Sequence, residues 1–229
     1  NKEMKNFKTQ KAFTLAETLI TLVIIGVIAA ITVPSLMQNF GNLSNNVALK
    51  KNYSVLSNAF ELANKFDGNL YEDWSHADGN QEAIYQNYTY LRNHLNILRV
   101  CNNRPGCWST DLTKAPDGST ADGANANGIG GNIVTFTLMD GTNVCLDYWG
   151  KAQAYNLYGV NRNLLPATLV VWVDVNGDRK PNKLGKDVFA FILTGNGLVP
   201  AGADNNSSYC KTTGYDCAAK YLHASDPYK

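Results

Sequence analysis

The stretch that decides the fold of this chain is Phe13-Thr14-Leu15-Ala16-Glu17-Thr18-Leu19-Ile20-Thr21-Leu22-Val23-Ile24-Ile25-Gly26-Val27-Ile28-Ala29-Ala30-Ile31-Thr32-Val33. Its twenty-one residues contain a single charged side chain, that of Glu17. A helix of this length rises about 30 Å, which matches the hydrocarbon core of a bilayer. A lone carboxylate in such a segment costs on the order of 3 kcal/mol, so it indicates a function and a cationic partner.

The residues in front of this stretch indicate where the partner comes from. If the chain is cut after Lys11-Ala12, Phe13 becomes a new N-terminus. Its ammonium then lies one helical turn from Glu17, or near the Glu17 of a neighbouring copy. The leader starts at the first residue or at Met4. The lysines before the apolar run are Lys2, Lys5, Lys8 and Lys11. They favour the cytoplasmic side of the membrane and so predict export of the remaining chain.

The sequence Lys11-Ala12-Phe13-Thr14-Leu15-Ala16-Glu17, with the apolar run after it, resembles the N-terminus of type IV pilins and type II secretion pseudopilins. The resemblance is detailed over residues 8–40 and loose elsewhere. It implies that a prepilin peptidase cuts between Ala12 and Phe13 and methylates the new amine. It also implies that Glu17 pairs with the N-terminus of an adjacent subunit during assembly. The family usually has glycine before the cut, where this chain has Ala12.

Two other interpretations of the segment are an ordinary signal peptide and a plain single-span anchor. A signal peptide has a shorter apolar core, followed by a cleavage site of small residues. Here the core is longer and Glu17 stands near its beginning. A plain anchor fits the length of the segment but needs neither the carboxylate nor a cut before Phe13.

The apolar run leads into an amphipathic helix. Gly26 and Pro34 mark the weakest stretch of the helix, because glycine lowers helix propensity and proline removes a backbone hydrogen bond. In the pilin family a similar stretch loosens when subunits pack, and a tolerated membrane-helix kink explains the pair equally well. Helical periodicity continues to Phe66, and the stop signal Asp67-Gly68-Asn69 follows. The apolar residues of this pattern are Leu36, Phe40, Leu43, Val47, Leu49, Tyr53, Leu56, Phe60 and Ala63.

The remaining residues predict a head in which this helix packs on a sheet. Residues 80–98 are expected to form a second helix, and residues 115–131 a polar, mobile surface loop. Strands are expected at 132–139, 142–148, 168–175 and 187–193, joined in an antiparallel meander. The fold class is therefore α+β and pilin-like. The domains are a leader (1–12), a membrane or filament-core helix (13–34), an amphipathic helix half (35–66) and a globular head (67–229).

The five cysteines predict two local disulfides, since an exported head meets oxidising conditions. Cys101 and Cys107 close a loop through a Pro-Gly turn, and Cys210 and Cys217 close a loop with a central glycine. Cys145 lies in an apolar strand and is expected to stay a buried thiol. A zinc site is the competing interpretation, but neither pair has zinc-ligand spacing and the three histidines are scattered.

The segment Asp174-Val175-Asn176-Gly177-Asp178 begins a loop with alternating oxygen-bearing side chains, which suit Ca²⁺. It starts like an EF-hand loop, but its glycine comes fourth and Gly185 stands where a bidentate glutamate belongs. A plain turn with aspartates capping backbone amides is the alternative. Major pseudopilins have a calcium-stabilised loop near this end of the domain. The expected ligands of a calcium ion are Asp174, Asn176, Asp178 and Asp187, and no other cofactor is expected.

The sequence predicts a structural protein. The formal net charge is +1, of which the leader holds +3, so the processed chain is near −2 and predicts no nucleic-acid partner. No catalytic motif is present, so no enzyme is expected. The resemblance implies a subunit of a type IV pilus or type II secretion pseudopilus. Its expected partners are other pilin-like subunits, prepilin peptidase, an inner-membrane assembly platform and lipid. The alternative is a monomeric, membrane-anchored extracytoplasmic binding protein.

Overall fold

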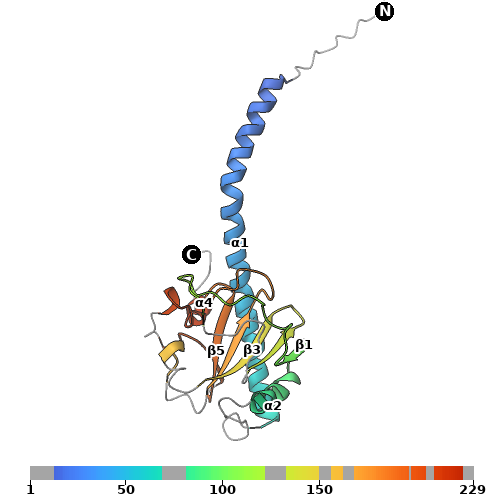
Figure 1. Cartoon of the computed structure of the whole chain (residues 1–229), viewed down its shortest axis with the longest axis vertical. Helices are drawn as coiled ribbons and strands as arrows, with labels where there is room; N and C mark the ends of the chain where they lie inside the picture. Colours follow the sequence, from blue (N-terminus) through green and yellow to red (C-terminus); the bar gives the residue numbers. More distant parts are fainter. Residues whose placement is uncertain are drawn as a thin grey trace, which may run out of the picture. The chain divides into compact units, whose positions relative to one another are not determined.

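The computed structural model describes residues 13–68, 81–121, 133–149, 156–161, 168–195, 197–204 and 209–223. The chain forms two compact units, Asn1–Asn42 and Leu43–Lys229. Helix α1 (Leu15–Phe66) contributes to both units (Figure 1). The first unit ends eight residues beyond the boundary expected at residue 34. The cut at Ala12 and residues 122–131 of the loop expected at residues 115–131 lie outside the described residues.

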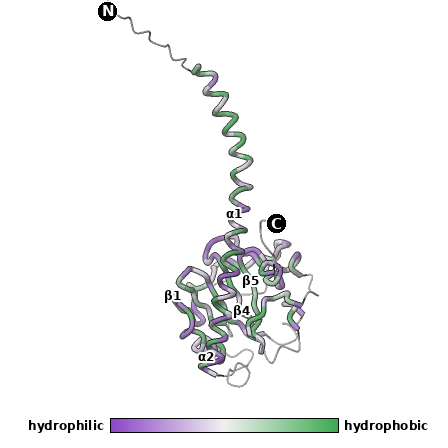
Figure 2. The backbone as a smooth tube through the Cα atoms, turned by 180° about the vertical axis from the view of Figure 1, so that it is seen from behind, coloured by the Kyte–Doolittle hydropathy of each residue, from purple (hydrophilic) through white to green (hydrophobic). Residues whose placement is uncertain are grey.

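The part of α1 in the first unit is apolar along its length, as the hydropathy colours of Figure 2 show. The helix runs through Gly26 and Pro34 without a break. Threonines in this part direct their hydroxyl groups to the backbone: Thr18 donates to the carbonyl of Leu15, and Thr32 to that of Ile28. The hydroxyl groups therefore need no water, and the helix tolerates them in apolar surroundings.

The second unit is built on a six-stranded antiparallel meander in which the strands pair in chain order. The strands are β1 (Ile97–Asn102), β2 (Ile133–Leu138), β3 (Asn143–Trp149), β4 (Thr168–Asp174), β5 (Val188–Thr194) and β6 (Gly197–Pro200). The expected strands at the centre of the sheet are present, with the turn at Asp140-Gly141 between β2 and β3. Both edge strands, β1 and β6, were missed, so β5 is not the last strand.

Helix α2 (Gln81–Arg92) is shorter than expected, because the chain turns at His94 and enters β1. The expectation that Leu98 extends the apolar face of this helix is therefore wrong. Leu98 lies at a β-bulge in β1 and is 56% exposed. The apolar spacing continued across the helix end by coincidence, and periodicity alone does not detect that end.

Helices α1 and α2 cover one face of the sheet and bury the larger core. On α1, Leu49, Leu56 and Phe60 are fully buried, and the ring of Tyr53 contacts that of Phe191 in β5. Val47 was expected on the packed face but is 62% exposed. Asn52 is also buried, and its amide donates to the carbonyl of Ala48 and to the hydroxyl of Thr142.

Loops cover the opposite face of the sheet and bury a second core around Trp172 and Tyr158. Ala115 and Ala121 belong to this core, so this part of the expected mobile loop is packed. The structure contains the two expected disulfides, Cys101–Cys107 and Cys210–Cys217, and the thiol of Cys145 is free and buried. Helix α4 (Ala218–His223) follows the second disulfide.

Replacing Phe60 with alanine should lower the free energy of unfolding of the head by about 3–5 kcal/mol, because it removes a fully buried ring and leaves a cavity. Val47→Ala on the same helix should change it by less than about 0.5 kcal/mol, since Val47 is exposed. Urea unfolding of the full chain in detergent micelles, followed by tryptophan fluorescence, measures both. Equal destabilisation by the two variants would contradict the packing of α1 described above.

Candidate functional site

The start of α1 forms a reciprocal capping arrangement between Thr14 and Glu17. The backbone N–H of Thr14 donates to Glu17 Oε2 at 2.9 Å, and the Thr14 hydroxyl donates to the same oxygen. The backbone N–H of Glu17 lies 3.3 Å from Thr14 Oγ1. This is a capping box, which satisfies backbone donors that the first turn of a helix leaves unpaired. Sequence reasoning missed this role of Glu17, although Thr-x-x-Glu is its signature.

The capping box leaves part of the Glu17 carboxylate available. Both bonds from Thr14 end on Oε2, and Oε1 accepts no hydrogen bond from the described residues. The side chain is exposed at the free end of the helix. Glu17 can therefore cap its own helix and offer a second oxygen to a cation from elsewhere.

The surface of α1 below Glu17 is too apolar to remain in water. Fifteen large apolar side chains between Phe13 and Phe40 are exposed. Among the described helices, α1 is the one whose length and apolar composition would allow it to cross a membrane. Exposed apolar surface of this extent indicates contact with lipid or with other protein. Gly26 has open space where a side chain would begin, so the structure gives it no packing role.

The loop between β4 and β5 brings two buried carboxylates together, those of Asp174 and Asp187. Asp187 is fully buried and accepts from the backbone N–H of Asn182 at 3.0 Å and of Lys183 at 2.6 Å. The side-chain amide of Asn176 donates to it at 3.0 Å. These three donors hold the Asp187 carboxylate at the base of the loop.

Asp174 is 1% exposed and has fewer partners than Asp187. Its Oδ1 accepts from the backbone N–H of Asn176, and its Oδ2 is buried without a hydrogen-bond partner among the described residues. Burial and the nearby carboxylate of Asp187 raise the pKa of Asp174 to about 8. Burial also raises the pKa of Asp187 above its usual value. The loop thus holds two carboxyl groups where water does not reach them, and Asp174 retains its proton up to about pH 8.

Two amide oxygens in the same loop are also unsatisfied. The Oδ1 atoms of Asn176 and Asn182 are buried and accept no hydrogen bond within the described ranges. Buried polar atoms are usually paired, so several unpaired oxygens beside two carboxylates indicate a missing cation or donor. Asn182 was missed by sequence reasoning. The signal was weak, because the residue follows a proline outside the alternating Asp-x-Asn-x-Asp spacing.

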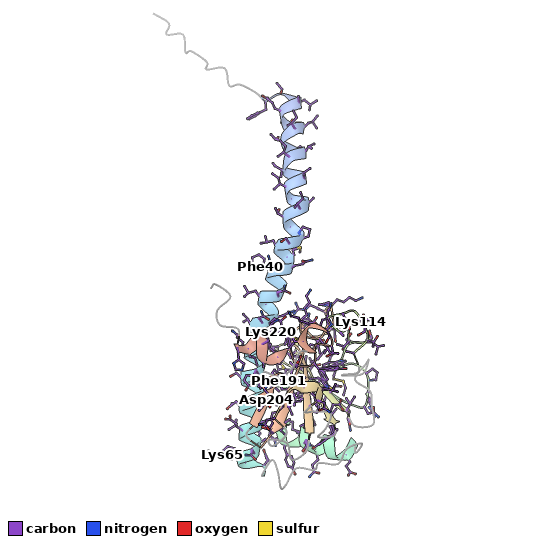
Figure 3. All side chains as sticks on the ribbon, turned by 90° about the vertical axis from the view of Figure 1, so that its left-hand side faces the viewer. Phe40, Lys65, Lys114, Phe191, Asp204 and Lys220 are labelled. Carbon is purple, nitrogen blue, oxygen red and sulfur yellow. A yellow bond between two sulfur atoms is a disulfide. The ribbon has the colours of Figure 1, made fainter. Side chains whose placement is uncertain are left out.

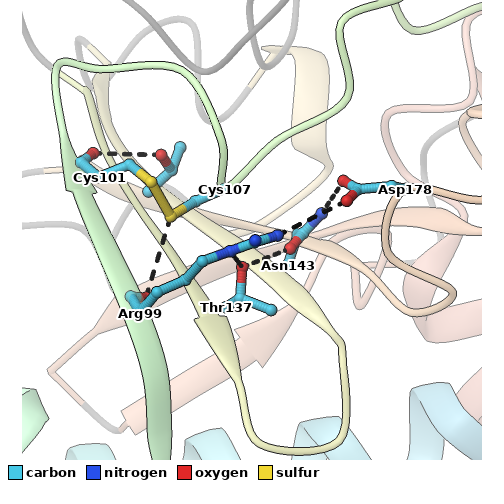
Figure 4. The surroundings of a disulfide bond; sticks show 7 residues. Arg99, Cys101, Cys107, Thr137, Asn143 and Asp178 are labelled. Carbon is cyan, nitrogen blue, oxygen red and sulfur yellow. Dashed lines mark hydrogen bonds and ion pairs between the residues drawn. A yellow bond between two sulfur atoms is a disulfide. The ribbon is translucent and has the colours of Figure 1, made fainter.

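Asp178, an expected ligand, has other partners. Its Oδ1 accepts from the side-chain amide of Asn143 at 3.0 Å, and its Oδ2 lies 3.6 Å from a guanidinium nitrogen of Arg99. Figure 4 shows this network beside the Cys101–Cys107 disulfide, with Arg99 also donating to the hydroxyl of Thr137. Asp178 is exposed and ties the loop to β1 and β3, so the structure does not gather it with the buried pair.

Close packing fixes the shape of the loop. Gly177 has a φ of 67°, and a side chain there would collide with the carbonyl oxygen of Gly141. A Cβ atom on Gly185 would lie 2.5 Å from the Sγ of Cys217 in the second disulfide. The side-chain amide of Asn182 donates to the hydroxyl of Ser109. Three segments, residues 108–121, 174–187 and 209–217, are therefore packed into one loop cluster.

One further group of metal-ligand residues occurs in this loop cluster. Within the described part of the chain, the ligand atoms of Cys210, Asp216 and Cys217 lie within 4.8 Å of one another, whereas Asp174, Asp178 and Asp187 form no such group. The two sulfur atoms are joined in a disulfide and have no thiolate to offer. A cation in the loop would therefore rely on two carboxylates and amide oxygens.

Comparison with known proteins identifies the N-terminal segment. Residues 7–33 match the family described as the prokaryotic N-terminal methylation motif, which is the prepilin-type signal of type IV pilins and pseudopilins. The match covers the leader end, Phe13, Glu17 and the apolar run. No curated protein and no solved structure matches the chain. The long apolar helix and the six-stranded antiparallel sheet form an α+β layout consistent with a pilin-like fold.

Without a bound cation, the stability of the head should fall as pH rises from about 4 to about 8. The folded-state pKa of Asp174 is raised above its ordinary value, so the folded state holds this proton more tightly and loses that advantage as pH rises through about 8. Asp187 contributes with the same sign. One such group gives a slope of at most about 1.4 kcal/mol per pH unit.

Urea unfolding of the full chain in micelles with a chelator, at pH 5 to 8, measures this slope. Asp174→Asn should flatten it, because the amide does not ionise, whereas Asp178→Asn should change it only slightly, because the charge of Asp178 is a minor cause of the raised pKa of Asp174. An unaltered slope in Asp174→Asn would show that another group is responsible.

Proposed function

We propose that this chain is a structural subunit of a type IV pilus or type II secretion pseudopilus, assembled from the inner membrane through α1. The observation that carries the proposal is the match of residues 7–33 to a prepilin-type signal at the start of a long apolar helix. The signal suits an inner-membrane-anchored precursor, and the family that carries it is structural rather than catalytic. Prepilin peptidase and other pilin-like subunits are the partners that it implies.

The geometry of α1 supports assembly in two stages. In the precursor, lipid covers the exposed apolar side chains between Phe13 and Phe40. In the filament, the same side chains pack against α1 helices of other copies, which replace lipid as the apolar environment. The new ammonium at Phe13 approaches the free Oε1 of a neighbouring Glu17, where the low dielectric strengthens the attraction. The head stays outside the cytoplasm throughout, in the periplasm or on the surface.

The alternative is a monomeric, membrane-anchored binding protein. It is consistent with an apolar helix and a folded head, but it gives the charge of Glu17 no pairing role. The capping box alone would explain Glu17 in such a protein, so the test must separate capping from charge pairing.

The mature protein should begin at Phe13, with a methylated amine. N-terminal sequencing and intact mass of the membrane-extracted protein decide this, and Ala12→Gly, which restores the residue usual in the family, should be processed at least as completely. A mature chain that begins near residue 33 would indicate signal-peptide cleavage and contradict the proposal.

Glu17→Ala and Glu17→Gln should both reduce the yield of sheared filaments by at least about tenfold, since a docking loss of 1.4 kcal/mol already gives that factor. Glutamine preserves the capping box but has no charge, so it isolates the pairing role of the carboxylate. Immunoblots of sheared and cell fractions provide the measurement. Normal yield with glutamine but not with alanine would assign Glu17 to helix capping alone.

The loop between β4 and β5 is proposed to hold a calcium ion that stabilises the head. Asp174, Asn176, Asn182 and Asp187 would supply side-chain oxygens, and Asp178 is omitted because Asn143 and Arg99 engage it. The support is the set of buried, unsatisfied oxygens beside two carboxylates, which hard cations prefer as ligands. The ion would supply positive charge to a site that otherwise retains a proton.

Calcium should therefore raise the melting temperature of the full chain in micelles by several degrees relative to EGTA, since a hundredfold excess over Kd stabilises by about 2.7 kcal/mol. Asp174→Asn should abolish the shift, and Asp178→Asn should preserve it. Differential scanning fluorimetry at pH 7.5 measures all three proteins. A shift that depends on Asp178 and not on Asp174 would place the ion elsewhere, and no shift would leave the loop as a plain turn.

A further inference from the structure

Five lysines of the head lie in segments that pack near the point at which α1 enters it, and they are called the lysine collar below (Lys114, Lys183, Lys186, Lys211 and Lys220). They come from the three segments of the loop cluster and from α4, so they are far apart in the sequence. All are exposed except Lys183, which is half-buried. Within the described ranges, none of their ammonium groups forms an ion pair.

Backbone contacts place the collar at the entry of α1. The carbonyl of Lys186 accepts from the side-chain amide of Asn45, the third residue of the second unit. Lys114 bridges to Lys183, and the amide of Asp117 donates to the carbonyl of Thr212, beside Lys211.

The figures agree with these contacts. Figure 3 shows Lys114 and Lys220 at the end of the head where α1 enters. Lys65 lies at the opposite end. The collar is therefore confined to one end of the second unit.

The carboxylates of the same segments do not neutralise the collar. Asp174, Asp187 and Asp216 are buried, and Asp111 and Asp178 face Lys180 and Arg99. Asp117 is the remaining carboxylate of these segments, and it accepts from the hydroxyl and backbone N–H of Ser119. In the described part of these segments, five lysines thus face one exposed carboxylate, that of Asp117, whose pKa the charge of Lys183 helps to lower. The other charges of the collar are available to a partner outside the chain.

We propose that the lysine collar binds the anionic headgroups of phospholipids in the bilayer that holds residues 13–33. Leu43 lies only ten positions after Val33, a distance of about 15 Å along a helix and at most about 35 Å in a fully extended chain. This tether keeps the collar within reach of the membrane surface, whose attraction for lysine extends over about one Debye length, 8–10 Å.

The proposal rests on the membrane-inserted precursor of the proposed function and adds a resting position for its head. Each lysine near an anionic surface strengthens binding roughly fivefold. The head would lie against the bilayer before assembly, and its release would accompany extraction of α1. Because exposed charges are screened, salt should weaken this contact without affecting insertion of the apolar helix.

The test is lysine acetylation of the full chain, one copy per nanodisc, in discs of phosphatidylcholine alone or with phosphatidylglycerol. Site-resolved mass spectrometry should show collar lysines acetylated about threefold more slowly in the anionic discs, with the difference removed by 0.5 M NaCl, as expected for exposed charges. Lys65, at the opposite end of the head, is the internal control and should react equally in both. Carbonate extraction from matched liposomes establishes insertion independently, so failed insertion is distinguished from a failed collar.

The variant Lys183→Gln/Lys186→Gln should speed acetylation of Lys114 and Lys211 in anionic discs, because the remaining charges hold the head less firmly. Lys65→Gln should not. Equal acetylation of the collar in both kinds of disc would overturn the proposal, as would equal protection of Lys65. A third outcome would also overturn the proposal. If the collar is protected in discs of phosphatidylcholine alone, and only with two copies per disc, the collar contacts another copy of the chain.

Discussion

One helix has to satisfy two environments, and the rest of this structure depends on that constraint. The first part of α1 exposes fourteen large apolar side chains and needs lipid or other helices around it. The last part buries Leu49, Leu56 and Phe60 against the sheet and belongs to the core of the head. The helix is continuous through Pro34, so the chain joins the two environments without an intervening linker. A head attached in this way is carried by whatever surrounds the apolar part.

The head has its own constraint in the loop between β4 and β5. Two carboxylates that water does not reach require a proton, a cation or donors, because an uncompensated buried charge costs too much free energy. Backbone donors and Asn176 serve Asp187, whereas Asp174 keeps an unsatisfied oxygen and a pKa of about 8. Gly185 and the second disulfide pack directly against this loop. The chemistry of the loop therefore bears on the whole cluster that carries the lysine collar.

The collar and the capping box illustrate how one residue can have a local and a distant role. Glu17 caps its own helix through Oε2 and leaves Oε1 for a partner. The carbonyl of Lys186 fixes Asn45 on α1, while its ammonium points to solvent from the same position. In both cases the backbone contact positions the residue and the free charge is what a membrane or another subunit would meet. Structure and recognition are thus built from the same side chains.

The sequence by itself determined the features that local chemistry controls. The apolar run, the stop after Phe66, the turn at Asp140-Gly141 and the short cysteine loops follow from helix length, turn residues and loop closure. The tertiary structure decided the rest, since burial depends on what faces each position. It paired the edge strands β1 and β6, buried Asn52, exposed Val47 and turned Asp178 toward Arg99.

The tertiary structure also brought together lysines that are far apart in the sequence, although the overall charge of the chain predicted no basic surface. Charge in a sequence is a sum, whereas the potential at a surface depends on which charges are buried, paired or brought side by side. Only the packing of three loops around the entry of α1 could decide that, because no local pattern encodes it.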